Sequence, residues 1–115
     1  MTINDPETLA EVAAAFAAYE AALMANDIPA LDSLFWASPS VLRYGAGENL
    51  YGQDEIIAFR KARPGGSPQR TLTRTVITTF GRDYATANTE FLREGTARIG
   101  RQSHAWARTP DGCSA

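Results

Sequence analysis

The sequence is poor in the residues that build disulfides and metal sites. Cys113 is its only cysteine, so no internal disulfide can form. One histidine and no cluster of acidic residues argue against a metal site, and no phosphate-binding loop is present, so we expect neither a metal nor another cofactor. The first five residues lack the basic start and apolar centre of a signal peptide, which makes the cytoplasm the default location.

Strong charge and long apolar runs are also missing. The chain has 11 Lys and Arg residues against 13 Asp and Glu, a net charge of −2, which provides no electrostatic footprint for nucleic acid or an anionic membrane. We expect no apolar run long enough to span a membrane. The 115 residues suffice for one core, so we expect a single domain over 1–115.

The N-terminal part of the chain has the pattern of an amphipathic helix. Asp5-Pro6-Glu7 combines an N-cap acceptor, proline at the first helical position and an early acid. One apolar stripe follows at helical spacing and ends before Asn26: Leu9, Val12, Phe16, Tyr19 and Leu23. Tyr19 is therefore either a core tyrosine bonded to a backbone carbonyl or a tyrosine that serves a pocket.

The remaining elements follow in a simple order. We predict helices over 28–36 and 53–62, a strand over 41–44 that enters a glycine-rich turn, and an antiparallel meander of strands. The meander strands are 70–80, 84–93 and 99–108. This order predicts an α+β fold with three N-terminal helices packed on a curved antiparallel sheet, which forms a cone with a central pocket.

The turn at 81–83 sets the register of the first hairpin. If Phe80 lies opposite Tyr84, five further pairs follow, namely Arg74–Glu90, Val76–Asn88, Ile77–Ala87, Thr75–Thr89 and Thr73–Phe91. The Ala87 face carries no charge and is assigned to the concave side, under the helices. The face with Arg74, Val76, Leu72 and Leu92 is assigned to the convex side.

The last strand and the first strand supply further candidates for a pocket wall. Gln102, His104 and Trp106 share one face, which we place inside because Trp106 is large and apolar. The lone His104 is either a hydrogen-bonding wall residue or a general base. Arg43 is a charged residue within a short apolar strand, so it either reaches water at an edge or lines a cavity.

The C-terminal segment has a turn signal but too few residues after it for a full strand. The turn signal at 109–112 is followed by three residues only. We therefore expect that a final strand is missing and that the strand at 99–108 has an open edge.

Five stretches together with Tyr19 resemble a known family. They are Leu42-Arg43-Tyr44-Gly45, Glu48-Asn49-Leu50-Tyr51-Gly52, Arg74-Thr75-Val76-Ile77-Thr78-Thr79 with Ala85-Thr86-Ala87-Asn88-Thr89-Glu90-Phe91, and Gly100-Arg101-Gln102-Ser103. The chain resembles the SnoaL-like, nuclear-transport-factor-like cone fold, and within it the oxalurate-catabolism family of HpxZ/AtzH type. The resemblance departs at the C-terminus, where family members continue with a tryptophan and one more strand.

The resemblance implies ureide and cyanuric-acid nitrogen catabolism. It implies a cofactor-free decarboxylating amide hydrolase that acts on a small anionic carboxylated urea of the dicarboxyurea type, with Tyr19 and Arg43 as the catalytic pair. A guanidinium fork suits a carboxylate, and a tyrosine hydroxyl can give a proton to the ureide nitrogen that decarboxylation leaves negative. Tyr51, Gln102, His104 and Trp106 are the candidate substrate-binding residues.

A second interpretation remains open. The chain could be a non-catalytic dimeric module that binds a small acid or supports an amidase. In both cases the resemblance implies a homodimer, and the apolar residues on the convex sheet face provide a reason for two copies to pair there.

Overall fold

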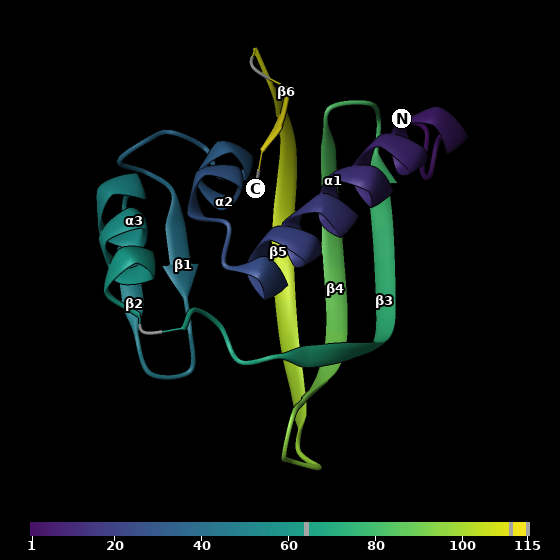
Figure 1. Ribbon diagram of the computed structural model, residues 1–115. Coiled ribbons are helices and arrows are strands. Elements are labelled where there is room, and N and C mark those ends of the chain that lie inside the picture. Colours follow the sequence, from purple (N-terminus) through teal and green to yellow (C-terminus); the bar gives the residue numbers. More distant parts are fainter. Residues whose placement is uncertain (64, 111, 115) are drawn as a thin grey trace.

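The computed structural model describes residues 1–63, 65–110 and 112–114. In chain order its elements are α1 (Pro6–Ala25), α2 (Ile28–Leu34), β1 (Leu42–Tyr44), β2 (Asn49–Tyr51), α3 (Gln53–Ala62), β3 (Arg70–Phe80), β4 (Tyr84–Arg93), β5 (Ile99–Thr109) and β6 (Gly112–Ser114). Figure 1 shows α1 crossing one face of the strands β3 to β5, with α2 and α3 beside its C-terminal end. The α+β class and three helices are as predicted, and α3 has the predicted bounds.

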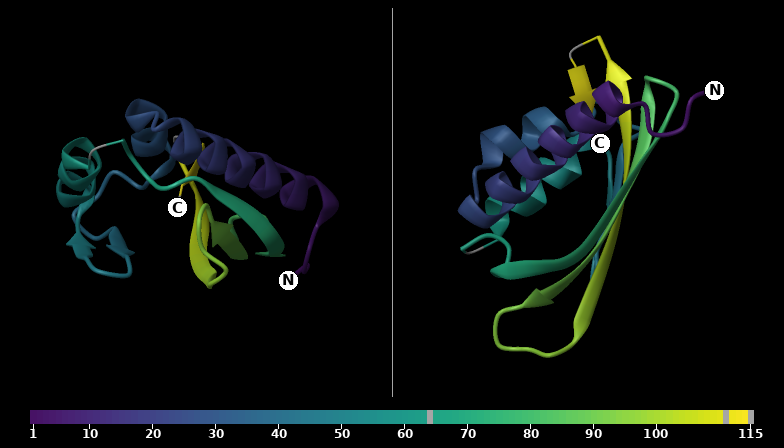
Figure 2. Two further views of the ribbon diagram at one scale, coloured as in Figure 1. Left: turned by 60° about the horizontal axis from the view of Figure 1, so that its bottom comes forward. Right: turned by 90° about the vertical axis from the view of Figure 1, so that its right-hand side faces the viewer.

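The strands form two sheets, whereas the sequence predicted one curved sheet. A four-stranded antiparallel sheet has the order β3-β4-β5-β6, and a separate two-stranded sheet pairs β1 with β2. The strand β2 was missed because we interpreted 45–52 as a turn that leads directly into α3; it is a tight hairpin in which Leu42 pairs with Tyr51. The larger sheet bends around the side that carries the helices (Figure 2).

The register of the first hairpin is confirmed along most of its length. Phe80 pairs with Tyr84, Ile77 with Ala87 and Thr75 with Thr89, as predicted. A bulge between Leu72 and Arg74 then shifts the register.

This bulge corrects two assignments. Phe91 pairs with Leu72 and not with Thr73. Leu72 therefore lies on the helix-covered side, where it packs against the core, and not on the convex face.

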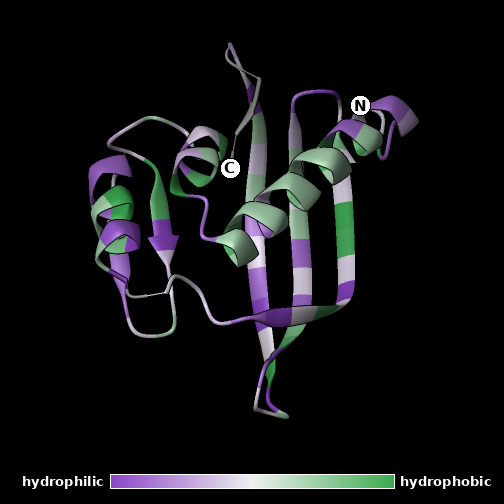
Figure 3. Ribbon diagram, in the orientation of Figure 1, coloured by the Kyte–Doolittle hydropathy of each residue, from purple (hydrophilic) through white to green (hydrophobic). Residues whose placement is uncertain are grey.

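The core lies between α1 and the concave face of the large sheet. The stripe residues Val12, Phe16, Tyr19 and Leu23 are all buried, and they meet the sheet at Ala85, Ala87 and Trp106 among others. Figure 3 shows α1 as a largely hydrophobic helix. By length and composition α1 could cross a membrane, contrary to the expectation from sequence, but its buried stripe is that of a core helix.

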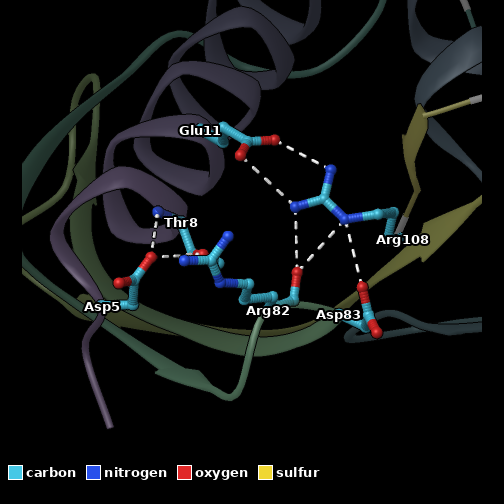
Figure 4. Close-up of polar contacts among 6 residues, drawn as sticks. All are labelled: Asp5, Thr8, Glu11, Arg82, Asp83 and Arg108. Carbon is cyan, nitrogen blue, oxygen red and sulfur yellow. Dashed lines mark hydrogen bonds and ion pairs between the residues drawn. The ribbon is translucent and has the colours of Figure 1, made fainter. Parts of the chain in front are cut away.

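Polar contacts fix α1 at both ends. Asp5 caps the helix by accepting a hydrogen bond from the Thr8 backbone N–H at 3.1 Å, and Asn26 ends it in the left-handed conformation with φ 53°. Near the N-terminal end, the guanidinium of Arg108 on β5 donates to Glu11 of α1 at 2.9 Å and to Asp83 at 3.2 Å (Figure 4). These contacts hold the helix across the sheet.

One edge of β5 is open over most of its length. The strand β6 pairs only with Ala107, Arg108 and Thr109, and within the described residues the rest of this edge has no strand partner. An apolar groove of about 610 Å³ lies beside it, lined among others by Trp36 and Leu42. The predicted turn at 109–112 includes residue 111, which lies outside the described residues.

Candidate functional site

The main cavity of the described chain is strongly cationic. It has a volume of about 860 Å³ and is bounded by α1, the β1–β2 hairpin, α3 and the ends of β3, β4 and β5. Its walls include six arginines: Arg43, Arg63, Arg70, Arg93, Arg98 and Arg101. Glu48 is the one acidic residue among the described lining residues. A concave site with this excess of guanidinium groups is suited to a small anion.

Four of the arginines are grouped around two phenylalanines. On the α3 side, the Cζ atoms of Arg43 and Arg63 lie 5.4 Å and 4.5 Å from the centre of the Phe59 ring. On the β4 side, those of Arg70 and Arg93 lie 4.3 Å and 5.6 Å from the centre of the Phe91 ring. Cation–π contact orients each guanidinium without using its N–H donors, which stay available to a ligand or a carboxylate. We call these groups the Phe59 cluster and the Phe91 cluster.

Arg43 lines the cavity, so the edge alternative for this residue is excluded. Its Nη1 donates to Glu48 Oε1 at 2.8 Å, and this hydrogen bond is the main reason why the pKa of Glu48 lies below its usual range. Within the described residues, Nε and Nη2 of Arg43 have no hydrogen-bond partner. Gly45 makes the Glu48 contact possible, because a Cβ atom there would run into the Glu48 carboxylate.

A second ion pair fixes the Phe91 cluster. Arg70 binds the two carboxylate oxygens of Glu20 on α1 at 3.0 Å and 2.7 Å, a bidentate geometry that sets the position of the guanidinium. Its Nη1 also donates to Gln102 Oε1 at 3.1 Å. Since only 3% of the Arg70 side chain and 14% of the Glu20 side chain are exposed, water screens this pair little.

The network continues to the lone histidine. Because Gln102 Oε1 accepts from Arg70, its Nε2 is the donor to His104 Nε2 at 2.9 Å, which places the histidine proton on Nδ1. Burial, followed by the charge of Arg70, lowers the pKa of His104 to about 4. The Nε2 atom of this histidine already accepts a hydrogen bond, and the ring is neutral at pH 7 and hard to protonate, so His104 is a poor general base. The geometry therefore favours a role for His104 as a hydrogen-bonding wall residue.

Tyr19 packs against the histidine of this network and also lines the cavity. It is 2% exposed, and its ring packs edge-on against His104 at 4.6 Å and Phe35 at 5.9 Å between centres. It nevertheless lines the same cavity as Arg43. The two residues of the predicted catalytic pair therefore meet at one site, from α1 and β1 respectively.

The four predicted substrate-binding residues are placed differently. Gln102 lines the cavity, while His104 lies behind it, against Tyr19. Trp106 is 1% exposed, packs on His104 at 5.8 Å and belongs to the core. Tyr51 is 53% exposed and does not line the cavity, because strand alternation on β2 turns Leu50 inward instead. Its ring packs on that of Tyr44.

The arginine clusters were missed in the sequence. One signal was available: of the 11 Lys and Arg residues only Lys61 is a lysine, and arginine is preferred where carboxylates or phosphates are bound in a fork. Which arginines converge depends on the sheet register and on the placement of α3, and local sequence patterns do not contain that information.

The chain belongs to the AtzH-like family, whose model matches residues 1–114. It is similar to a solved protein of unknown function from Pectobacterium atrosepticum (53% identity, TM-score 0.94, covering 97% of this chain and 88% of that one). It is also similar to a cystatin-like fold protein from Burkholderia xenovorans (46% identity, TM-score 0.94, covering 99% and 90%).

More distant structures share the fold alone. A nuclear transport factor 2-like protein from Salmonella enterica has 20% identity and a TM-score of 0.71, covering 94% of this chain and 85% of that one. A ketosteroid isomerase-like protein from Erwinia carotovora has 19% identity and a TM-score of 0.69, covering 95% and 91%. No curated protein matches the chain. The family of AtzH type that the sequence indicated is thus confirmed by the family model, and the distant structures show the shared fold.

The low pKa of His104 predicts loss of stability in acid. The unfolded chain takes up the histidine proton as the pH falls below about 6.5, whereas the folded protein does so only near pH 4. Folding stability is therefore lost through this window, by about 1–2 kcal/mol between pH 7.5 and pH 5. In His104→Gln, urea denaturation should show most of this loss gone. An unchanged pH dependence in the variant would contradict the assignment, because His104 is the only histidine.

Proposed function

We propose that this protein is a cofactor-free decarboxylating amide hydrolase that acts on a small carboxylated urea of the dicarboxyurea type. The observation that supports this most is the convergence of Tyr19 and six arginines on one cavity of about 860 Å³, where Glu48 is the single acidic residue in the described part of the wall. Membership of the AtzH-like family agrees with this class of substrate.

The two phenylalanine clusters suit a ligand with a carboxylate at each end. Dicarboxyurea is small and planar and carries two negative charges. One carboxylate would take the free Nε and Nη2 edge of Arg43 in the Phe59 cluster, and the other would face the Phe91 cluster across the cavity. A guanidinium binds a carboxylate through two parallel hydrogen bonds and stays charged at every working pH.

The chemical step needs one proton and no nucleophile. The bond between a ureide nitrogen and its carboxylate carbon breaks, carbon dioxide leaves, and the bonding electrons stay on the nitrogen. Tyr19 donates its hydroxyl proton to that nitrogen, and water restores the proton afterwards. The products are carbon dioxide and urea-1-carboxylate. The nearby guanidinium groups stabilise the negative charge that develops on the ureide.

One observation favours the non-catalytic alternative. Arg43 is already paired with the internal carboxylate of Glu48, as expected of a structural arginine. The same cavity would then hold a small acid without converting it. The ion pair is monodentate and about a quarter of each side chain is exposed, so a ligand carboxylate can reach the remaining donors.

The two-cluster account predicts selective binding of dianions. At low salt, calorimetry should show that malonate binds the protein more tightly than acetate does. Arg93→Ala, which removes one arginine of the Phe91 cluster, should weaken malonate binding about tenfold or more. Arg74→Ala, on the opposite face of the sheet, is the matched control and should leave the affinity unchanged. Equal binding of malonate and acetate would contradict the account.

We also propose that two copies pair through the convex face of the large sheet. This face carries Val76, 46% exposed, with Leu92 and with Arg74 directly opposite Glu90. Because Leu72 lies on the other side of the sheet, the convex face is less apolar than the sequence predicted. The opposite charges of Arg74 and Glu90 favour a two-fold arrangement in which Arg74 of one copy meets Glu90 of the other.

Sedimentation at micromolar concentration tests the assembly. The native protein should sediment as a dimer and Val76→Glu as a monomer, because a buried unpaired carboxylate opposes association. Tyr51→Glu, on the small sheet, should remain dimeric. A native protein that sediments as a monomer would show that the convex face does not pair.

A further inference from the structure

A buried arginine next to Tyr19 takes no part in the cavity wall. Arg60 lies on α3, and only 5% of it is exposed. Its Cζ lies 4.7 Å from the centre of the Phe35 ring, and Phe35 is also in contact with Tyr19. Within the described residues its Nε and Nη2 atoms are buried without a hydrogen-bond partner.

The surroundings of Arg60 leave its charge poorly compensated. Burial is the largest influence on the pKa of Arg60 and lowers it, while the nearby Tyr19 and Asp32 side chains raise it through their charges. No ion pair with a carboxylate forms at Arg60 among the described residues, in contrast to Arg43 and Arg70. A buried cation without a paired anion destabilises the fold, so an apolar residue would be expected at this position unless the charge has a use.

From this geometry we infer that Arg60 is a positioning residue for Tyr19. It fixes the Tyr19 hydroxyl at the cavity wall and stabilises the negative charge that the oxygen gains when it gives up its proton. This role rests on the proposed function, in which Tyr19 is the proton donor. Arg60 acts through Tyr19 and has no contact with the substrate.

The inference distinguishes Arg60 from the other arginines. Arg43 and the Phe91 cluster lie at the cavity, and their loss should weaken substrate binding. Arg60 lies behind Tyr19, so its loss should slow the proton transfer and leave binding nearly unchanged. A lysine keeps the charge at this position but loses the planar fork, so it should restore only part of the rate.

The contact itself can be tested without substrate. The protein would be labelled with tyrosine that carries carbon-13 at Cζ, and the Tyr19 signal assigned from its loss in Tyr19→Phe. In Arg60→Met this signal should shift, while those of the other three tyrosines stay in place. Lys61→Met removes an exposed cation from the next position of the same helix and is the matched control. An unchanged Tyr19 signal in a folded Arg60→Met protein would overturn the inference.

The positioning role of Arg60 is tested by a double-mutant cycle with Tyr19, in which the turnover of dicarboxyurea is measured. Arg60→Met should lower kcat about 10- to 100-fold with KM within about twofold. In a Tyr19→Phe background the same substitution should have no further effect, whereas a purely structural role would lower the rate of both proteins alike. If the effects multiply, Arg60 does not act through Tyr19 and the inference fails, with the proposed function intact. If the native protein releases no carbon dioxide, the proposed function fails, and the spectra still decide the contact.

Discussion

A Tyr19→Phe variant should convert dicarboxyurea about 10²- to 10⁴-fold more slowly than the native protein, the range that a positioned proton donor contributes. The phenyl ring keeps the packing against His104 and Phe35, so the fold and the affinity for malonate should be preserved. Initial rates of carbon dioxide release measure the first effect and calorimetry the second. A variant that retains the native kcat would exclude Tyr19 as the donor.

Arg43→Lys provides the companion measurement. A lysine retains the charge but presents a single ammonium group, so the variant should lose much of the activity, chiefly through a higher KM. Full activity in this variant would reduce Arg43 to a general electrostatic role.

Removing the Glu20 carboxylate should have the largest effect on stability. The Arg70 side chain is only 3% exposed, and Glu20→Ala would leave its charge uncompensated inside the protein. The loss of one partner from a buried ion pair costs about 3–5 kcal/mol, which urea denaturation at pH 7 would detect.

An exposed ion pair supplies the control for this prediction. Glu11 pairs with Arg108, and about 40% of each side chain is exposed to water. Glu11→Ala should therefore change the free energy of unfolding much less than Glu20→Ala. Equal losses in the two variants would show that the Glu20–Arg70 pair does not fix the Phe91 cluster in the way that the site requires.

Local patterns predicted most of the fold. The stripe of α1 and the register near Phe80–Tyr84 follow from spacing and from one turn, and both are confirmed. The bulge at Leu72 was not predicted, since an extra residue in a strand rich in Thr and Val has no distinct pattern. The strands β1 and β2 have three residues each, too few for alternation to separate a hairpin from a turn.

The site was predicted less completely than the fold. Tyr19, Arg43 and Gln102 line one cavity, but Tyr51 and Trp106 lie outside it. An inward-facing position on a strand, such as that of Trp106, can belong either to the packed core or to a cavity wall, and the sequence does not distinguish the two. Arg60 lies four residues after Ile56 on α3, and both residues are buried. Its place beside Tyr19 depends on how α3 packs against α2 and the adjacent Phe35, which the spacing along one helix does not specify.

Turnover of dicarboxyurea is the most direct test of the central proposal. Purified protein would be mixed with dicarboxyurea, and carbon dioxide and urea-1-carboxylate would be measured over time, next to the Tyr19→Phe/Arg43→Ala double variant. The account predicts equal molar release of the two products by the native protein and a rate at the uncatalysed level for the double variant. Release by the double variant at the native rate, or none by the native protein, would contradict it.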